Sequence, residues 1–315
     1  MRVALLADIH GNLPALAAVI AELERLQPDH VVVDGDLING APFSGAVIDR
    51  VRAQNWVVVR GNHEFYYLDF GTERAEPGCE DPQRWGQLHW LVEQITPDQG
   101  AYLALLPDER TLFLPGTQPL CVAHGVPGHN RTGFRQDTPA AQVAAELAGV
   151  AAPTVVSAHT HVQVDRHIHR LPPADEALIP PSRNGATRWH LINPGSVGMP
   201  LNGDPQAQFA VVEAVPEAVE AGGWQVTFQR VSYDRRAALA AYAESGMADA
   251  GGVMTQLFYW QLVTAQPELI FFFRWAYEQG LDPEYALDDA FYAYCAATGR
   301  DQHIRKYDPL YVARP

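Results

Sequence analysis

Lysine is almost missing from this sequence of 315 residues: Lys306 is the single example, and every other basic residue is an arginine. Basic residues number 22 against 37 acidic ones, which leaves a formal net charge of -15. Affinity for nucleic acids and anionic lipid comes largely from lysine and arginine that neutralise phosphates. We therefore expect no nucleic-acid polymer and no membrane surface among the partners.

Cysteine and long apolar runs are also scarce. The three cysteines, Cys79, Cys121 and Cys295, show no CxxC spacing, so neither a disulfide framework nor a zinc ribbon is indicated. The apolar run before Asp8 is too short for a signal peptide, and residues 269–273 are too few to cross a bilayer. These absences predict a folded protein of the reducing cytoplasm.

Short apolar runs recur through the first half of the chain, at residues 3–7, 31–33, 56–59, 120–123 and 155–156. Unbroken runs rich in β-branched residues are typical of strands buried on both faces. After Asn12, apolar residues follow helical spacing, and Pro14 stands in the first turn, where its missing N–H costs nothing. The alternation of strand, helix and strand predicts an α/β fold.

The second half changes character after two further expected strands at residues 209–215 and 224–231. Helical candidates rich in Phe, Tyr and Trp follow, at residues 235–245, 256–265, 267–279 and 283–298. We place a boundary near Gly251, which gives a domain over residues 1–250 and an aromatic-rich helical extension over 251–315. So much aromatic surface has to be buried. Packing within the chain is the first expectation, and a homodimer interface is the alternative.

Each apolar run of the first half leads into residues that can bind a metal. Seven such residues are Asp8, His10, Asp36, Asn62, His124, His159 and His161. In open α/β sheets, ligand sites lie beyond the carboxyl ends of the strands, so these residues can converge. Mixed oxygen and imidazole ligands suit Mn, Fe, Zn or Mg. Seven ligands exceed the need of one tetrahedral ion but fit two ions about 3.5–4 Å apart.

The order of these blocks carries a family resemblance. The blocks are DIH, GD, GNHE, H and HTH, at residues 8–10, 35–36, 61–64, 124 and 159–161. They resemble the signature of the calcineurin-like metallophosphoesterases, in particular their small bacterial phosphodiesterase-like branch, over roughly residues 1–245. The resemblance implies a four-layer α/β/β/α sandwich of two mixed sheets, followed here by the C-terminal helical extension. Residues 1–250 would then be the catalytic domain.

The resemblance also implies a role for each ligand. Asp36 would bridge two divalent ions, and His63 would remain free as general acid on the leaving oxygen. The nucleophile would be a metal-bound hydroxide. The other ligands would form two sets of three: Asp8, His10 and His161 on one ion, and Asn62, His124 and His159 on the other.

Departures from the family pattern narrow the expected activity. Asn39 and Gly40 stand where the protein Ser/Thr phosphatases of this superfamily have Asp and Arg, which disfavours a phosphoprotein phosphatase and a phosphatase-like diadenosine tetraphosphatase. Ala158 replaces a usual glycine but removes no ligand. We expect a phosphodiesterase for small phosphodiesters or nucleotides, with a phosphomonoesterase for nucleotides or other metabolites as the alternative. A non-catalytic scaffold is the weakest alternative, because all ligands are kept.

Other segments keep two interpretations open. His129 and Arg131 lie in a loop rich in Gly and Pro, where they contact substrate or simply face solvent. Asn12 is a further candidate for substrate contact or for support of the ligands, and Glu64 for support. Residues 65–100 form either an aromatic cap over the site or a small satellite core. The block NPGSVG at residues 193–198 either matches a later motif of the family branch or is a plain turn between strands. No site role is expected for His167, His169 or His190.

Overall fold

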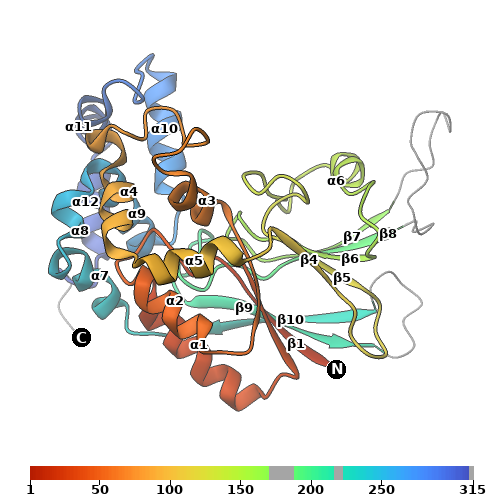
Figure 1. Ribbon diagram of the computed structural model, residues 1–315. Coiled ribbons are helices and arrows are strands. Elements are labelled where there is room, and N and C mark those ends of the chain that lie inside the picture. The colour runs from red at the N-terminus through yellow and green to blue at the C-terminus, as the bar shows by residue number, and fades with distance from the viewer. Residues whose placement is uncertain (170–187, 216–222, 312–315) are drawn as a thin grey trace.

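The computed structural model describes residues 1–169, 188–215 and 223–311 (Figure 1). Its ten strands are β1 (Arg2–Leu6), β2 (His30–Asp34), β3 (Val57–Val59), β4 (Glu109–Leu112), β5 (Leu120–Ala123), β6 (Thr154–Val156), β7 (Val164–His169), β8 (Arg188–Asn193), β9 (Ala207–Ala214) and β10 (Trp224–Val231). The described helices are α1 (Leu13–Leu26), α2 (Ser44–Arg52), α3 (Asn62–Asp69), α4 (Pro82–Gln94), α5 (Pro97–Leu105), α6 (Ala140–Glu146), α7 (Arg235–Glu244), α8 (Met247–Ala250), α9 (Gly252–Thr264), α10 (Glu268–Glu278), α11 (Leu287–Thr298) and α12 (Arg300–Tyr307).

The strands form two mixed sheets of five. The first has the order β10-β9-β1-β2-β3, and the second has the order β4-β5-β6-β8-β7. Strands β1, β2 and β3 are parallel, and so are β5, β6 and β8, while β4, β7, β9 and β10 run antiparallel to their neighbours. The five apolar runs correspond to β1, β2, β3, β5 and β6, which confirms the predicted α/β fold.

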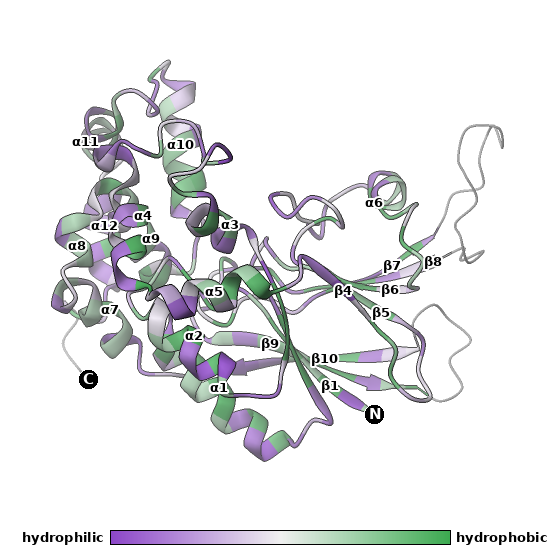
Figure 2. Cartoon of the chain, in the orientation of Figure 1, coloured by the Kyte–Doolittle hydropathy of each residue, from purple (hydrophilic) through white to green (hydrophobic). Residues whose placement is uncertain are grey.

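The two sheets pack face to face, and helices cover their outer faces. Val3 and Leu5 of β1 join the core between the sheets, whereas Ala4 and Leu6 point the other way, into the core beneath the helices. On the far side, Val143 of α6 packs on the outer face of the second sheet. The predicted four-layer sandwich is confirmed. Figure 2 shows α1 carrying hydrophobic and hydrophilic residues, as expected of a helix with one buried face.

Most helices gather on one side of the molecule, with α4, α9, α10 and α11 close together (Figure 1). Helix α4 packs on α8 and α9, and all of them share one hydrophobic core with α1 and the first sheet. Phe272, Phe291 and Tyr294 of the extension are buried in this core. Helices from both sides of residue 250 share this core. The predicted division into two domains at that residue stays a prediction.

The described part of the chain contains no helix with the length and apolar character needed to cross a membrane. Its three cysteines are unpaired, and two of them, Cys79 and Cys121, are buried.

Candidate metal centre

The loops after β1 and β2 are tied together by backbone hydrogen bonds. The backbone N–H of His10 donates to the carbonyl of Asp36 at 2.9 Å, and that of Gly11 donates to Leu37 at 2.8 Å. Because β1 and β2 are parallel neighbours, their carboxyl ends open at the same edge of the sheet. The backbone therefore fixes Asp8, His10 and Asp36 relative to one another.

Glu64 joins the loop after β3 to this pair. Its carboxylate is fully buried and accepts backbone N–H bonds from Gly61 at 2.7 Å, Leu37 at 2.8 Å and Asp36 at 3.0 Å. A side chain at Gly61 would overlap the Asp36 carboxylate, so this position requires glycine. These bonds hold the loops after β2 and β3 together, and a role for Glu64 in supporting the ligands stays a prediction.

The structure brings the predicted ligands together in two groups that share Asp36. In each group, ligand-type atoms lie within 4.8 Å of one another: Asp8, His10, Asp36 and His161 in the first, and Asp36, His124 and His159 in the second. Asn62 joins the second group, because its Oδ1 lies 3.1 Å from His124 Nε2 and 2.8 Å from His159 Nδ1. These are the two sets of residues that the family resemblance implies.

Two imidazoles are oriented by backbone carbonyls behind them. His124 Nδ1 donates to the carbonyl of Asp34 at 2.7 Å, and His161 Nδ1 donates to that of Met199 at 2.5 Å. Each bond fixes the tautomer, so the Nε2 lone pair of each ring faces the other ligands. This is the orientation that a metal-binding histidine needs.

The Asp8 carboxylate shows that these residues fit a cation. Asp8 is fully buried, and within the described part of the chain neither of its oxygens makes a hydrogen bond. The buried Nδ1 of His10 has no hydrogen-bond partner there either. Burying a carboxylate that makes no hydrogen bond is costly, whereas a divalent ion between Asp8, Asp36 and the imidazoles would offset that cost. The donor set, with carboxylate, amide and imidazole, suits such an ion.

Burial and neighbouring charges shift the pKa values of the predicted ligands in both directions. Burial raises the pKa of Asp8 well above its usual value. For Asp36, the same burial effect is outweighed by the nearby rings of His124 and His63, which hold its pKa well below the usual range. Burial lowers the pKa of His161 to about 3 and that of His159 to about 4. Both imidazoles are therefore neutral at pH 7, as ligands have to be.

Backbone strain is concentrated at the same residues. Five predicted ligands adopt left-handed backbone conformations, with φ values of 52° at Asp8, 49° at His10, 51° at Asp36, 65° at His159 and 58° at His161. Such conformations cost about 1–3 kcal/mol each for a residue other than glycine, and they are characteristic of functional sites. The surrounding hydrogen bonds hold the loops in place against this cost.

The block at residues 193–198 supports the loop after β1. Ser196 Oγ donates to the carbonyl of Asp8 at 2.8 Å, and the N–H of Gly198 donates to the same carbonyl at 3.0 Å. Asn12 donates to the Gly198 carbonyl at 2.8 Å and also caps α1 by accepting the N–H of Ala15. The Asn12 side chain is fully buried in these contacts, and substrate binding by it stays a prediction.

His63 lies at the start of α3 with its ring held by an amide. Asn39 Nδ2 donates to His63 Nδ1 at 2.8 Å, while Asn39 Oδ1 accepts from Gln87 Nε2 at 2.7 Å and from the N–H of Gly40. The proton of the neutral ring therefore sits on Nε2, which lies 3.9 Å from Asp36 Oδ2. Burial lowers the pKa of His63. Its role as general acid stays a prediction.

Sequence reasoning missed three residues of this environment. Asp34 is fully buried at the end of β2, and burial raises its pKa to about 7. The sequence feature that could have indicated Asp34 is the aspartate at the end of the apolar run VVVD. Gln87 of α4 and Thr255 of α9 extend the chain of hydrogen bonds behind His63, because Thr255 Oγ1 donates to Gln87 Oε1 at 3.4 Å. No spacing in the sequence could reveal that contact.

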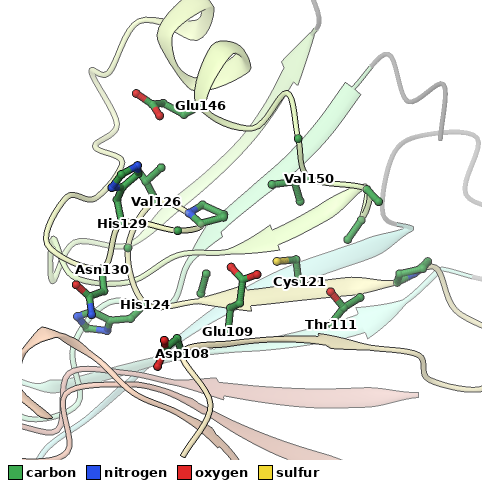
Figure 3. Close-up of a pocket in the computed structure, with 18 of the residues that line it drawn as sticks. Asp108, Glu109, Thr111, Cys121, His124, Val126, His129, Asn130, Glu146 and Val150 are labelled. Atoms are coloured by element: carbon green, nitrogen blue, oxygen red, sulfur yellow. The ribbon is translucent and has the colours of Figure 1, made fainter. Parts of the chain in front are cut away.

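The loop with His129 and Arg131 borders a separate hollow of about 930 Å³ beside His124 (Figure 3). The hollow also has carboxylates along its walls, at Asp108, Glu109 and Glu146. The Arg131 guanidinium pairs with Glu76 and lies 4.9 Å above the ring of Tyr66. Substrate contact by His129 or Arg131 stays a prediction.

A third group of ligand-type residues lies on β7 and β8. His190 Nε2 bonds to Asp165 at 2.7 Å, and the His190 ring stacks on that of His167 with 4.3 Å between the centroids. His167 and His190 are direct partners in the strand register. These contacts are those of a cross-strand pair, and the group shares no residue with the metal centre.

The fold is a four-layer sandwich, and the ends of its strands carry a buried cluster of Asp and His residues that could bind metal. This combination is typical of one class of protein, the metal-dependent phosphoester hydrolases. Within that class, the model of the calcineurin-like phosphoesterase family matches residues 1–163. The chain belongs to this family.

Solved structures agree with this assignment. A metallophosphoesterase from Sphaerobacter thermophilus is 26% identical, with a TM-score of 0.58 over 78% of this chain and 95% of that one. A hypothetical protein from Pyrococcus horikoshii OT3 shares the fold, with 19% identity and a TM-score of 0.59 over 81% of this chain and 95% of that one. No curated protein sequence matches the chain.

Proposed function

We propose that this protein hydrolyses phosphoesters with two divalent metal ions, held by the two ligand groups that share Asp36. The observation that carries the proposal is the buried Asp8 carboxylate, which makes no hydrogen bond within the described residues and is grouped with Asp36 and the imidazoles of His10 and His161. Manganese, iron, zinc and magnesium all suit this ligand set. The unpaired cysteines fit a reducing compartment, and we place the activity in the cytoplasm.

Divalent ions at such a site draw charge from the phosphoryl oxygens and lower the pKa of bound water. In the reaction, a water oxygen forms a bond to phosphorus while the bond from phosphorus to the ester oxygen breaks. The departing oxygen then needs a proton. His63, whose Nε2 lies 3.9 Å from Asp36 Oδ2, supplies it as an imidazolium and becomes neutral. The proton that the attacking water loses returns His63 to the imidazolium form.

Phosphodiesters are the preferred substrates in this proposal, and phosphomonoesters are the alternative. Gly40 stands where phosphatases of this superfamily carry an arginine, so this position supplies no guanidinium for the second charge of a monoester. A diester carries one negative charge and needs no such partner. The preference is therefore for small phosphodiesters, nucleotide diesters among them.

The test compares bis-p-nitrophenyl phosphate with p-nitrophenyl phosphate, using manganese-loaded enzyme and measuring metal content in parallel. Wild type should hold two equivalents of metal and prefer the diester. Asp36→Asn should lose metal and activity together, by more than the roughly 10- to 100-fold typical of groups behind a ligand. Asp98→Asn is the matched control, because its carboxyl is 77% exposed and pairs with Arg52 at the surface.

Each other outcome has a definite meaning. Monoester preference would support the alternative substrate class. A metal-loaded Asp36→Asn variant with normal activity would contradict the dinuclear site. A wild-type protein that binds no metal and hydrolyses neither compound would contradict the whole proposal and favour a non-catalytic scaffold.

A further inference from the structure

A cavity of about 590 Å³ opens directly beside the metal centre. Residues of helices α3, α4, α9, α10 and α11 line it. Its floor is the centre itself, formed by His10, Asp36, Asn62, His63, His159 and His161. A group bonded to a phosphoryl at the metal ions would therefore enter this cavity, enter the hollow beside His124 or point out to solvent. We call this cavity the helical pocket.

The walls of the helical pocket are mostly apolar. The His63 ring packs edge-to-face against Tyr66, with 5.4 Å between centroids, and against Phe258 at 6.2 Å. The other apolar and aromatic residues of the wall include Trp85, Leu88, Met254, Leu269, Ile270, Phe273, Tyr277 and Leu287, and the polar Asn39, Gln87 and Gln261 also line it. Cavities of 300–1,000 Å³ with apolar walls and a few polar groups at one end are typical small-molecule sites.

Charge inside the helical pocket is nearly absent beyond the centre. Among the described residues that line it, Arg84 is the one arginine, and there is no lysine. The Arg84 guanidinium pairs with Glu284 at 3.3 Å and lies 5.7 Å from the centroid of the Trp85 ring. A second phosphate would find no free cation here, and the hollow beside His124 carries carboxylates instead. The pocket therefore disfavours polyphosphates and charged ester groups.

We propose that the helical pocket binds the ester group of the substrate, and that this group is large, uncharged and apolar. The inference rests on the proposed function, since the metal centre has to hold the phosphoryl group. Aliphatic chains and fused aromatic rings share the chemistry that these walls recognise. The helical extension, which the family model does not match, would then set the specificity of the enzyme.

The experiment uses methyl, butyl and octyl p-nitrophenyl phosphates with the manganese-loaded full chain. All three release p-nitrophenolate, so the chemistry of the leaving group is constant and only the second ester group changes. Each methylene buried in the pocket should raise kcat/KM by about fourfold. A naphthyl p-nitrophenyl phosphate tests whether the pocket accepts a fused aromatic ring in place of an aliphatic chain. The p-nitrophenyl ester of thymidine 5′-phosphate tests a nucleoside group.

Variants at the rim locate the effect. Ile270 and Tyr277 line the pocket but are 47% and 51% exposed, so polar replacements there should leave the fold intact. The double variant Ile270→Ser with Tyr277→Ser should lose about tenfold in kcat/KM on the octyl ester and little on the methyl ester. Tyr307→Ser is the matched control, because Tyr307 is 59% exposed and lies outside the pocket.

Equal rates on the methyl and octyl esters would overturn the inference, and so would faster hydrolysis of the nucleoside ester than of the octyl and naphthyl esters. Calorimetric titration with octylphosphonate and methylphosphonate provides a readout without turnover, and tighter binding of octylphosphonate is expected. If the methyl ester is hydrolysed with no gain from chain length, the pocket inference fails while the proposed function stands. If none of the esters is hydrolysed, the proposed function fails first.

Discussion

The ligands of the metal centre come from loops after β1, β2, β3, β5 and β6, whereas the walls of the helical pocket come from regular helices. The loops carry ionisable groups in strained backbone conformations, and the helices carry aromatic and aliphatic side chains. In our proposals, the first region would recognise what all phosphoesters share, and the second would recognise what differs between them. Chemistry and specificity would then belong to separate parts of the chain, which meet at His63.

The largest effect that tests this division is expected at His63. His63→Ala should lose about 10²- to 10⁴-fold in rate, the usual contribution of a general acid, while metal content stays at the wild-type level. The loss should be greater for esters with an alkoxide leaving group than for those that release p-nitrophenolate, which leaves without a proton. Metal loss equal to that of Asp36→Asn would show that His63 is itself a ligand. Rates on both kinds of ester, with metal analysis, provide the measurement.

The second effect concerns the cost of charge in the loop region. Burial raises the folded-state pKa of Asp34 to about 7 from its ordinary 3.8. The folded chain therefore keeps this proton to higher pH than the unfolded chain, and the associated stability is lost as the pH rises from about 4 to about 7. In chelator, the stability of Asp34→Asn relative to wild type should rise by about 4 kcal/mol across that range.

Urea unfolding at successive pH values measures this difference, with Asp98→Asn as the control for an exposed carboxyl. A stability difference that does not change with pH would show that Asp34 is ionised at no cost in the folded protein. Repeating the series with manganese should reduce the pH dependence, because a nearby cation favours the charged carboxylate.

A smaller effect is expected where the two regions are joined. Gln87→Leu removes the donor to Asn39 Oδ1 and frees the amide that holds His63. We expect a loss of about tenfold in kcat, at the low end of what supporting hydrogen bonds contribute, with metal content unchanged. The defect should grow with the basicity of the leaving group, which a merely destabilised fold would not produce. Gln87→Glu, which can still accept from Thr255 but cannot donate to Asn39, should behave in the same way.

The smallest effect is expected at the outer surface of the helices. Tyr292 of α11 is 68% exposed, so Tyr292→Ser should change the free energy of unfolding by less than about 0.5 kcal/mol. Because Phe272, Phe291 and Tyr294 are buried within the chain, we expect light scattering to give the mass of a monomer. A dimeric mass that Tyr292→Ser reduces to that of a monomer would instead support the predicted homodimer through the extension.

The loop region was largely predictable from the sequence, because a polar residue at the end of a buried strand has few structural explanations. That argument alone placed Asp8, Asp36 and His124 beyond the carboxyl ends of buried strands, which the structure assigns to two sheets. The helical region was not predictable to the same depth. A phenylalanine such as Phe258 follows helical spacing whether it fills a core or lines a pocket, and only the packing of α9 against α4 distinguishes the two.

The hydrophobic pattern of the sequence also failed to predict short or irregular elements. Strand β4 is mostly exposed, and its sequence ERTL carries no apolar run. Helix α9 begins at Gly252, several residues before the predicted start at 256, because glycines at 251 and 252 hide the helical pattern there. The paired glutamine and threonine behind His63 depend on side chains 168 residues apart.

The left-handed backbones at the ligands bear on how such a protein drifts over generations. Glycine and asparagine adopt left-handed backbone conformations readily, and neither carries a charge. Replacing Asp8 or His161 by one of them would therefore reduce both the backbone strain and the cost of burying the side chain. Bound metal repays that cost through mass action, but only while it is available. A lineage that ceases to need turnover would therefore lose its ligands early and gain stability in doing so. Its descendants would keep the sandwich, and with it a binding surface ready for another use.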